Sequence, residues 1–283
     1  MKLLRYGQPG SENPGMLAPD GTVRDLSGVL AELDGAALSP GALGRLAALE
    51  WRSLPQVEMA GMRLGACVAR PLNFVCIGLN YADHAAETGA PIPKEPIIFL
   101  KSLGAYCGPN DDVMIPRGSK KTDWEVELGV VIGTTARSVP EHAAMDHVAG
   151  YCVINDVSER EFQTERGGTW DKGKGCDTFG PTGPWLVTQD EVADPQNLAM
   201  WLEVDGKRMQ NGSTKTMIFG VKKLVSYVSH FITLHAGDII STGTPPGVGM
   251  GIKPEPVFLK AGQTIRLGIE GLGEQTQQVV AAG

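Results

Sequence analysis

The stretch DWEVELGVVIG, from Asp123 to Gly133, has the composition of a strand that lies inside a protein. Its β-branched and apolar residues are those that buried strands favour. Glu125 and Glu127 nevertheless stand within it, two residues apart. Because side chains alternate across a strand, these two carboxylates point to the same side. The stretch therefore predicts a buried strand that aims two like charges at one small volume.

The remaining sequence predicts a β-rich α+β fold. Strand candidates separated by Gly and Pro turns follow one another at residues 74–81, 96–101, 124–133, 147–158, 183–188, 200–209, 238–245 and 263–271. Helical spacing of apolar residues is confined to residues 26–35, 40–51 and 221–238, the last with Gly237 as its stop. Since the strands do not alternate regularly with helices, a βαβ barrel is disfavoured and a mixed β-roll or sandwich is favoured. We expect a small N-terminal α+β domain at residues 1–68 and the β-roll domain at residues 69–283.

The composition excludes several classes of protein. The chain has 283 residues, of which 42% are hydrophobic and 20% charged, and its formal net charge is -7, which argues against non-specific nucleic-acid binding. The longest apolar runs are shorter than the roughly 18–20 residues of a membrane span, and the N-terminus turns polar too soon for a signal peptide. The five cysteines are widely spaced and contain no CxxC pair, so neither a zinc ribbon nor a disulfide scaffold is expected. We expect a soluble, reduced, cytoplasmic protein that binds neither nucleic acid nor membrane.

The glutamate pair needs a partner if the strand is buried. Two close carboxylates in a low-dielectric pocket require a cation, an Arg or Lys clamp, or a strand face open to water. A second apolar strand candidate ends in another acid, Asp156. Three carboxylates offer hard oxygen ligands, which suit Mg²⁺ or Mn²⁺ better than zinc, and would leave about three coordination positions open. The sequence therefore predicts a divalent ion site at Glu125, Glu127 and Asp156.

Two further groups carry acid–base chemistry. His84 and Glu87 lie three residues apart in GLNYADHAAETG, residues 78–89, where a short helix would make them neighbours. A carboxylate that holds an imidazole fixes its tautomer and supports a general base, and the alternative is a solvated surface contact. Lys174 stands among glycines in a loop, from which it can point into a cavity or into solvent. The glycine-rich stretch 242–251 lacks the Gly-Lys-Ser/Thr ending of a phosphate loop and is interpreted as a tight loop close to a site.

Taken together, these motifs resemble the fumarylacetoacetate hydrolase superfamily. The resemblance rests on GLNYADHAAE, FLKS, WEVELGVVIG, INDVSER followed by FQ, KGCDTFGPTGP and STGTPPGVG, in the order and spacing of the family, over residues 70–270 or so. The start MKLLRYG also resembles the small N-terminal domain of bacterial members. The resemblance implies a mixed β-roll, a homodimer, and Mg²⁺ or Mn²⁺ at one end of the roll. It also implies that Glu125, Glu127 and Asp156 are the ion's ligands and that His84 and Glu87 are a water-activating pair on a lid.

The resemblance further assigns Lys174 as the active-site lysine, and Lys101, Gln163 and Thr244 as positions that contact substrate in some relatives. One departure is visible, because many relatives have Ser-Phe where this chain has Gly175–Cys176. The wall of the pocket beside the lysine therefore differs, and substrate preference does not carry over with the motif.

The activity that the resemblance implies is hydrolysis of the C3–C4 bond of a 2,4-diketo acid of the acylpyruvate type, to pyruvate and a carboxylic acid. A sugar-derived 2,4-diketo-3-deoxy acid is one such substrate. The alternatives are oxaloacetate-type decarboxylation, isomerisation of 2-hydroxyhepta-2,4-diene-1,7-dioate, a ureidoglycolate lyase, and a protein that binds a metal and a keto acid without turnover. Decarboxylation needs no attacking water, so the His84 and Glu87 pair favours hydrolysis.

Overall fold

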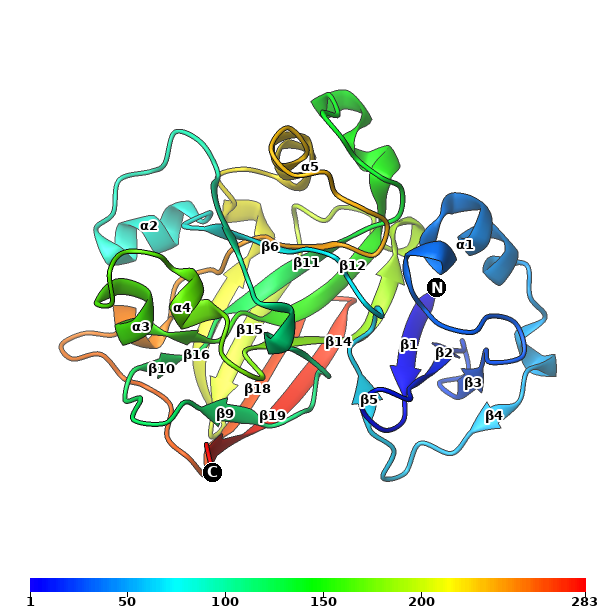
Figure 1. The fold of residues 1–283 in the computed structure, drawn as a ribbon, viewed down its shortest axis with the longest axis horizontal. Helices are drawn as coiled ribbons and strands as arrows, with labels where there is room; N and C mark the ends of the chain where they lie inside the picture. The colour runs from blue at the N-terminus through cyan, green and yellow to red at the C-terminus, as the bar shows by residue number, and fades with distance from the viewer.

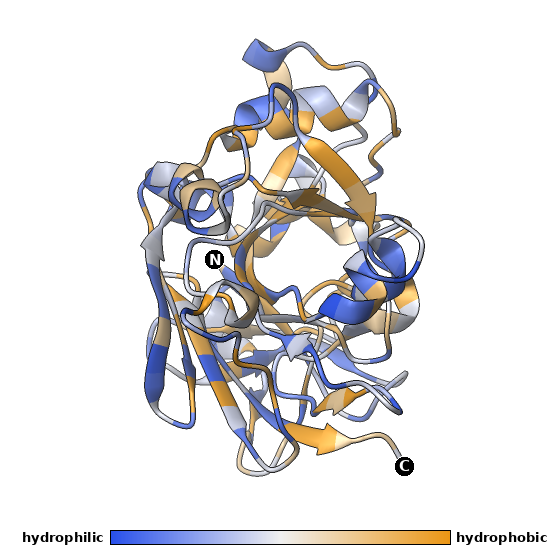
Figure 2. Cartoon of the chain, turned by 90° about the vertical axis from the view of Figure 1, so that its left-hand side faces the viewer, coloured by the Kyte–Doolittle hydropathy of each residue, from blue (hydrophilic) through white to orange (hydrophobic). Residues whose placement is uncertain are grey.

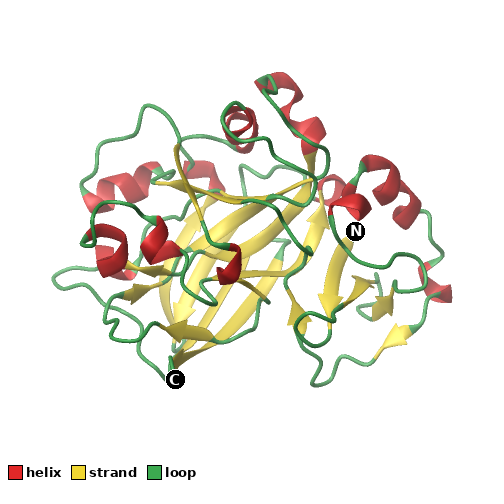
Figure 3. Ribbon diagram, in the orientation of Figure 1, coloured by secondary structure: helices red, strands yellow, loops and turns green.

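The fold consists of two packed β-sheets with short helices at the periphery, as a computed structural model shows (Figure 1). The structure describes residues 1–283, apart from the side chain of Thr88. Strands occupy the middle of the molecule and helices lie around them (Figure 3). The predicted class, a β-rich mixed α+β fold, is confirmed.

The large sheet is mixed and contains the glutamate-bearing strand near its centre. Its strand order is β4-β3-β2-β1-β14-β12-β11-β17-β6-β7, with β5 paired to β1 and β8 to β14. The bounds of these strands are β1 Lys2–Tyr6, β2 Asn13–Leu17, β3 Val23–Asp25, β4 Gln56–Val57, β5 Leu64–Gly65, β6 Phe74–Gly78, β7 Ile97–Leu100, β8 Tyr106–Cys107, β11 Val126–Ile132, β12 Val148–Asn155, β14 Gly180–Thr188 and β17 Ile239–Ser241. Because β11 is hydrogen-bonded on both sides, to β12 and β17, its residues are buried throughout.

A second sheet packs against the large one, in the order β16-β15-β18-β19-β9. It comprises β9 Val113–Ile115, β15 Ala199–Val204, β16 Lys207–Ser213, β18 Thr264–Ile269 and β19 Gly273–Ala281. The two sheets share one apolar core, to which β11 contributes Val126, Leu128 and Val130, and β15 contributes Met200 and Leu202. Hydrophobic residues concentrate on the strands, whereas the peripheral helices carry long hydrophilic stretches (Figure 2).

The helices are short. They are α1 Pro40–Ala47, α2 Ala82–Thr88, α3 Arg160–Thr164, α4 Asp171–Lys174 and α5 Val221–Ser229, with 3₁₀ turns at η1 Gly35–Leu38, η2 Trp51–Ser53, η3 Leu103–Ala105, η4 Glu141–His147, η5 Gln189–Glu191, η6 Thr214–Thr216 and η7 Gly249–Gly251. A small pair of strands, β10 Thr122–Asp123 and β13 Ser158–Glu159, joins the start of β11 to the end of β12. Helices α2, α3 and α4 lie together on the side away from the N-terminal strands (Figure 1). Among the described residues, no helix combines the length and apolarity that a bilayer span requires.

The N-terminal segment is joined to the rest by strand pairing. β1 pairs with β14 at Lys2↔Val187 and Leu3↔Leu186, so the large sheet runs from the N-terminal strands into the remainder of the fold. The hairpin β2–β3 pairs through Gly15↔Asp25, Met16↔Arg24 and Leu17↔Val23. The division at residues 68 and 69 stays a prediction about domains.

One expected helix is shorter than predicted and another is absent. The helix predicted at residues 221–238 ends at Ser229, because Leu234 then exchanges backbone hydrogen bonds with Ala136, at 2.8 and 3.0 Å. Residues 26–35 form turns instead of a helix. The backbone N–H of Leu26 donates to Pro14 and the carbonyl of Leu33 accepts from Ala69, and both bonds tie the segment to its neighbours. In each case tertiary hydrogen bonds override the local spacing of apolar residues.

Candidate active site

Three carboxylates converge at one end of the β11–β12 pair. Glu127 lies in β11, Glu125 directly precedes that strand and Asp156 directly follows β12. The antiparallel register pairs Glu127 with Ile154, and the N–H of Asp156 donates to the carbonyl of Glu125 at 2.9 Å. One carboxylate oxygen from each residue lies within 4.8 Å of the others, and the three residues are 6%, 1% and 1% exposed. The structure therefore brings the predicted acid triad together in the protein interior.

Buried cations surround the triad. Lys174 Nζ donates to Glu125 Oε2 at 2.7 Å and to Asp156 Oδ2 at 2.8 Å. Lys101 Nζ lies 2.6 Å from Asp156 Oδ1, and Arg160 Nη2 lies 2.7 Å from Glu125 Oε1, both as ion pairs without the angles of a hydrogen bond. Two of the three acids thus have positive partners from the chain itself.

Glu127 is the member of the triad that has hydrogen bonds but no ion pair. Its Oε2 accepts from Ser241 Oγ at 2.6 Å and from the N–H of Gly243 at 2.8 Å. The salt bridges of Lys101, Arg160 and Lys174 run to Glu125 and Asp156 instead. Burial, reinforced by the charges of Asp156 and Glu125, raises the pKa of the Glu127 carboxyl well above its usual value. An ionised Glu127 therefore lacks a counter-charge of its own.

The pKa shifts of the neighbouring Glu125 and Lys174 favour their charged forms, unlike that of Glu127. Burial alone would raise the pKa of Glu125, but the positive charges of Lys174 and Arg160 outweigh burial and lower it to about 2. Burial likewise disfavours charged Lys174, yet the pKa of Lys174 is raised because the carboxylates of Asp156 and Glu125 outweigh burial. The ionised Glu125 and Lys174 therefore share a low-dielectric pocket with Glu127, which has no positive partner of its own.

The donor set fits a divalent ion of the hard type. Carboxylate oxygens at this spacing are the ligands that Mg²⁺ and Mn²⁺ take, and the orphaned charge of Glu127 is what such an ion would neutralise. Glycine shapes this corner, since Gly243 has φ +96° and a Cβ there would lie 2.8 Å from Asn80 Cβ. That left-handed conformation is what aims the Gly243 N–H at Glu127.

The predicted histidine and glutamate pair lies on α2, above the triad. The helix ends at Gly89 in the left-handed conformation. His84 Nδ1 and Glu87 Oε2 are 3.0 Å apart. The carboxylate of Glu87 also accepts from the N–H of Gly247, at 3.0 and 3.2 Å, and Gly247 has φ +103°. The helix is therefore docked on the glycine-rich loop 243–251, and Glu87 is held between His84 and that loop.

One cavity of about 260 Å³ joins these groups. His84, Glu125, Glu127 and Lys174 all line it, so the base, two of the acids and the lysine face the same space. Titratable groups with strongly shifted pKa values around one cavity are typical of catalytic sites. Gln163 and Thr244 also line the cavity.

The predicted substrate contacts divide into two kinds. Gln163 presents its amide to the cavity, with Oε1 accepting from Arg160 Nη1 at 3.0 Å. Thr244 Oγ1 donates to the carbonyl of Val126 at 2.9 Å. Lys101 lies behind the triad, where its Nζ donates to the carbonyls of Val157 and Lys174 at 3.1 and 2.6 Å. Its observed contacts hold Asp156 in place, and a direct contact of Lys101 with substrate stays a prediction.

Sequence reasoning missed two charged residues. Arg160 follows Asp156 by four residues and lines the cavity, and its Nε donates to Asp123 Oδ2 at 2.8 Å. Asp123 also accepts from the N–H groups of Gly249 and Met250, at 2.6 and 2.9 Å, so it ties the glycine-rich loop to Arg160. Their presence at the ends of the quoted strands was the available signal, since charged residues at strand ends often line sites.

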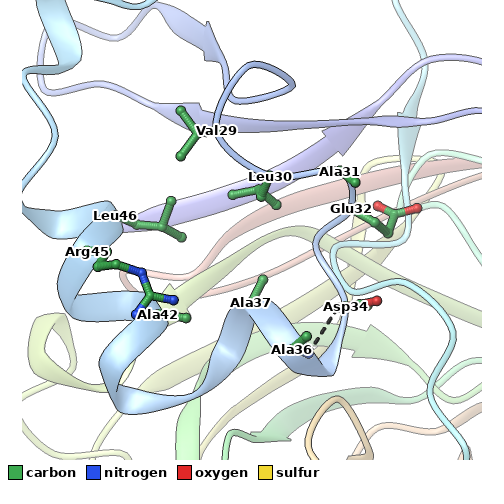
Figure 4. Close-up of a pocket in the computed structure, with 10 residues that line it drawn as sticks. All are labelled: Val29, Leu30, Ala31, Glu32, Asp34, Ala36, Ala37, Ala42, Arg45 and Leu46. Atoms are coloured by element: carbon green, nitrogen blue, oxygen red, sulfur yellow. Dashed lines mark hydrogen bonds between the residues drawn. The ribbon is translucent and has the colours of Figure 1, made fainter.

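A second cavity, of about 320 Å³, lies in the N-terminal segment (Figure 4). Its lining is mostly Ala, Leu and Val, and its acidic groups already have structural partners. Asp34 Oδ1 caps η1 by accepting from Ala36 N at 2.9 Å, and Glu32 Oε1 accepts from Arg5 Nε at 2.8 Å. The cavity at the acid triad is therefore the better candidate for chemistry.

A buried acid cluster, a lysine and a docked imidazole around one small cavity are typical of an enzyme active site. Comparison with known proteins agrees. The model of the family "Fumarylacetoacetate (FAA) hydrolase C-terminal" matches residues 73–280. The chain belongs to the fumarylacetoacetate hydrolase family.

Relatives and solved structures extend the likeness over the whole chain. A protein of Burkholderia ambifaria (strain MC40-6), named only provisionally as a hydrolase, is 65% identical over 277 residues, covering 98% of each chain. Fumarylacetoacetate hydrolase from Exiguobacterium antarcticum is 35% identical with a TM-score of 0.85, and covers 100% of both chains. A 2-hydroxyhepta-2,4-diene-1,7-dioate isomerase from Mycobacterium marinum is 33% identical, with a TM-score of 0.78 and coverage of 100% and 99%. Maleylpyruvate hydrolase from Sphingobium sp. SYK-6, in complex with manganese(II) and pyruvate, is 29% identical, with a TM-score of 0.83 and full coverage of both chains.

Proposed function

We propose that the chain is a metal-dependent hydrolase that cleaves the C3–C4 bond of a 2,4-diketo acid, releasing pyruvate and a carboxylic acid. The observation that carries the proposal is the His84–Glu87 pair facing the same cavity as the acid triad and Lys174. Hydrolysis requires a base for water beside the group that binds the keto acid, and these residues offer both. The manganese and pyruvate in the Sphingobium structure support the choice of ion and product.

Glu125, Glu127 and Asp156 would hold the ion, Mg²⁺ or Mn²⁺. When bound, such an ion supplies a chelation point for the carboxylate and 2-oxo groups and withdraws electrons from them. The charge of Glu127 would then be compensated, which is what its raised pKa shows to be lacking in the chain alone. In the structure Lys174 donates to Glu125 and Asp156, at 2.7 and 2.8 Å, and it is the positive group of the cavity beside the proposed ion ligands.

The His84–Glu87 pair would activate the water. With Nδ1–H donated to Glu87, the lone pair of the imidazole lies on Nε2, the atom that takes a proton from water. The resulting hydroxide adds to C4 of the substrate and forms a tetrahedral intermediate. Glu87 is itself held by Gly247, so the orientation of the imidazole is set before substrate binds.

Collapse of the tetrahedral intermediate breaks the C3–C4 bond. The bonding electrons pass to the pyruvate half, while C4 becomes the carboxylic acid. The ammonium of Lys174, held in its charged form by two carboxylates, stabilises the negative charge that develops. The proton that His84 took from water can then be delivered to C3, which completes pyruvate and returns the imidazole to its starting state.

The same site could serve isomerisation of a 2-hydroxy-diene-dioate, and the Mycobacterium marinum structure favours keeping this second candidate. Isomerisation moves a proton and needs no attacking water. Decarboxylation of oxaloacetate, a ureidoglycolate lyase and binding without turnover make less use of the His84–Glu87 pair. The His84–Glu87 pair therefore favours hydrolysis over these alternatives.

A coupled assay tests the proposal. Pyruvate released from a panel of 2,4-diketo acids is measured with lactate dehydrogenase, with and without Mg²⁺ or Mn²⁺, and oxaloacetate and the diene-dioate serve as comparison substrates. We expect ion-dependent pyruvate release from diketo acids that His84→Ala reduces strongly. Release from oxaloacetate alone, or equal rates in His84→Ala, would contradict hydrolysis.

A further inference from the structure

The cavity has an apolar wall on the β7 and α4 side. Ile97 and Phe99 are two residues apart on β7, so they share a face, and both line the cavity. Phe99 meets Trp170 edge to face, with ring centroids 5.5 Å apart. Trp170 lies tightly over Gly78, where a Cβ would be 2.1 Å from the indole. This wall, formed by Ile97, Phe99 and Trp170, is closely packed and offers no charge to a ligand.

The cations around the cavity are already engaged. The three guanidinium nitrogens of Arg160 lie 2.8 Å from Asp123, 2.7 Å from Glu125 and 3.0 Å from Gln163. Arg160 is therefore fixed at three points, and it would keep the Asp123 and Gln163 contacts if Glu125 turned to an ion.

The two lysines are held in the same way. Lys174 bridges Glu125 and Asp156, and Lys101 is committed to Asp156 and to two backbone carbonyls. Burial makes each of these pairs costly to break.

The buried charges leave no surplus of positive charge for a second carboxylate. Five buried acids, Asp123, Glu125, Glu127, Asp156 and Glu159, stand against the three buried cations Arg160, Lys101 and Lys174. A divalent ion would bring the sum of these charges to zero, so the first carboxylate of a keto acid already adds one negative charge. A second carboxylate would add another, and the wall of Ile97, Phe99 and Trp170 offers it no positive partner.

From this wall and this balance we propose that the substituent beyond C4 of the substrate is short and uncharged, so that the substrate is a diketo monocarboxylate. The inference rests on the proposed function, and it excludes dicarboxylate substrates such as a diene-dioate. The cavity of about 260 Å³ lies just below the roughly 300–1,000 Å³ range of ligand pockets, which suits a compact molecule. The amide of Gln163 provides one polar contact for an uncharged tail.

A matched pair of ligands tests the proposal. 2,4-Dioxoheptanoate and 2,4-dioxoheptanedioate differ only in a terminal methyl against a terminal carboxylate. Their affinities are measured by calorimetry with the full chain and saturating Mn²⁺, in His84→Ala so that turnover does not interfere. We expect the monocarboxylate to bind about 100-fold more tightly, because the dioate must bury an uncompensated charge. Equal affinities, or tighter binding of the dioate, overturn the proposal.

A charge placed in the wall provides the second arm. In the same His84→Ala background, Ile97→Lys should give the distal carboxylate a positive partner. The ratio of the monocarboxylate affinity to the dioate affinity should then fall at least tenfold. Ile97→Met is the matched control and should leave this ratio unchanged. An unchanged ratio in Ile97→Lys would show that the tail lies elsewhere and would overturn the proposal. Pyruvate release from the same two acids by the unsubstituted chain tests hydrolysis separately. Tighter binding of the monocarboxylate without release of pyruvate would contradict the proposed function and would still support the inference about the tail.

Discussion

Replacing Glu127 with glutamine should stabilise the ion-free protein. The carboxylate is 1% exposed, and burial with two nearby acids raises its pKa well above the usual value. A glutamine oxygen can still accept from Ser241 and Gly243, which now donate at 2.6 and 2.8 Å, so the change removes charge and keeps the hydrogen bonds. A raised pKa in the folded state means that the ionisable carboxyl lowers stability at neutral pH, and glutamine of equal size avoids that cost, so we expect a gain of about 1–3 kcal/mol in the free energy of unfolding.

The same substitution should abolish the response to the ion. At Mn²⁺ concentrations about 100 times the dissociation constant, the unsubstituted chain gains about 2.7 kcal/mol, because only the folded state binds. Glu127→Gln should gain little. Urea unfolding after chelator treatment, with and without added Mn²⁺, measures both effects. Glu12→Gln is the matched control, since Glu12 pairs with Arg5 and Arg63 at 3.1 and 2.9 Å far along the chain from the triad, and it should lose stability while keeping the full response. A Glu127→Gln protein that is less stable without ion and equally responsive to it would refute the reasoning.

Three further predictions concern the neighbouring groups. His84→Ala should lower the turnover number by about 10²–10⁴ while Mn²⁺ affinity, measured by calorimetry, stays the same; loss of ion binding would argue for a structural role. Lys174→Met should slow turnover. It should also lower the free energy of unfolding of the ion-free protein by about 3–5 kcal/mol, because Glu125 and Asp156 lose their shared partner. Unaltered urea unfolding would contradict a stabilising role of these ion pairs. The pKa of Glu125 lies at about 2 in the folded chain against an ordinary 4.5, so its contribution is fully present above about pH 4.5 and is lost as the pH falls toward 2. Glu125→Gln should therefore flatten the acid limb of stability by about 3 kcal/mol, and an unchanged acid limb would contradict the assigned shift.

Local patterns predicted the centre of the site because they depend on strand geometry alone. Glu125 and Glu127 are two residues apart, and alternation along an extended chain is enough to direct them to one side. His84 and Glu87 follow from the spacing of one helical turn, which α2 provides. In both cases the physical cause lies within a few residues of sequence.

Long-range partners could not be obtained in this way. Arg160 meets Asp123 across 37 residues, and the pair exists because β10 and β13 align the ends of two strands. The contact of Lys101 with Asp156 was not predicted from the sequence, because it depends on how β7 packs against α4. The shortened α5 has the same origin, since the pairing of Leu234 with Ala136 competes with a helical pattern that continues beyond Ser229. These features depend on tertiary contacts, which the spacing of residues in one sequence does not contain.

The most direct test is the effect of protein-bound Mn²⁺ on the ¹³C relaxation of labelled pyruvate. If the acid triad holds an ion that binds a keto acid, the C1 and C2 signals of pyruvate should broaden strongly and the C3 methyl signal should broaden less. This broadening should be lost in Glu127→Gln and retained in Glu12→Gln. Broadening no greater than that given by free Mn²⁺, or identical in the two variants, would contradict the account.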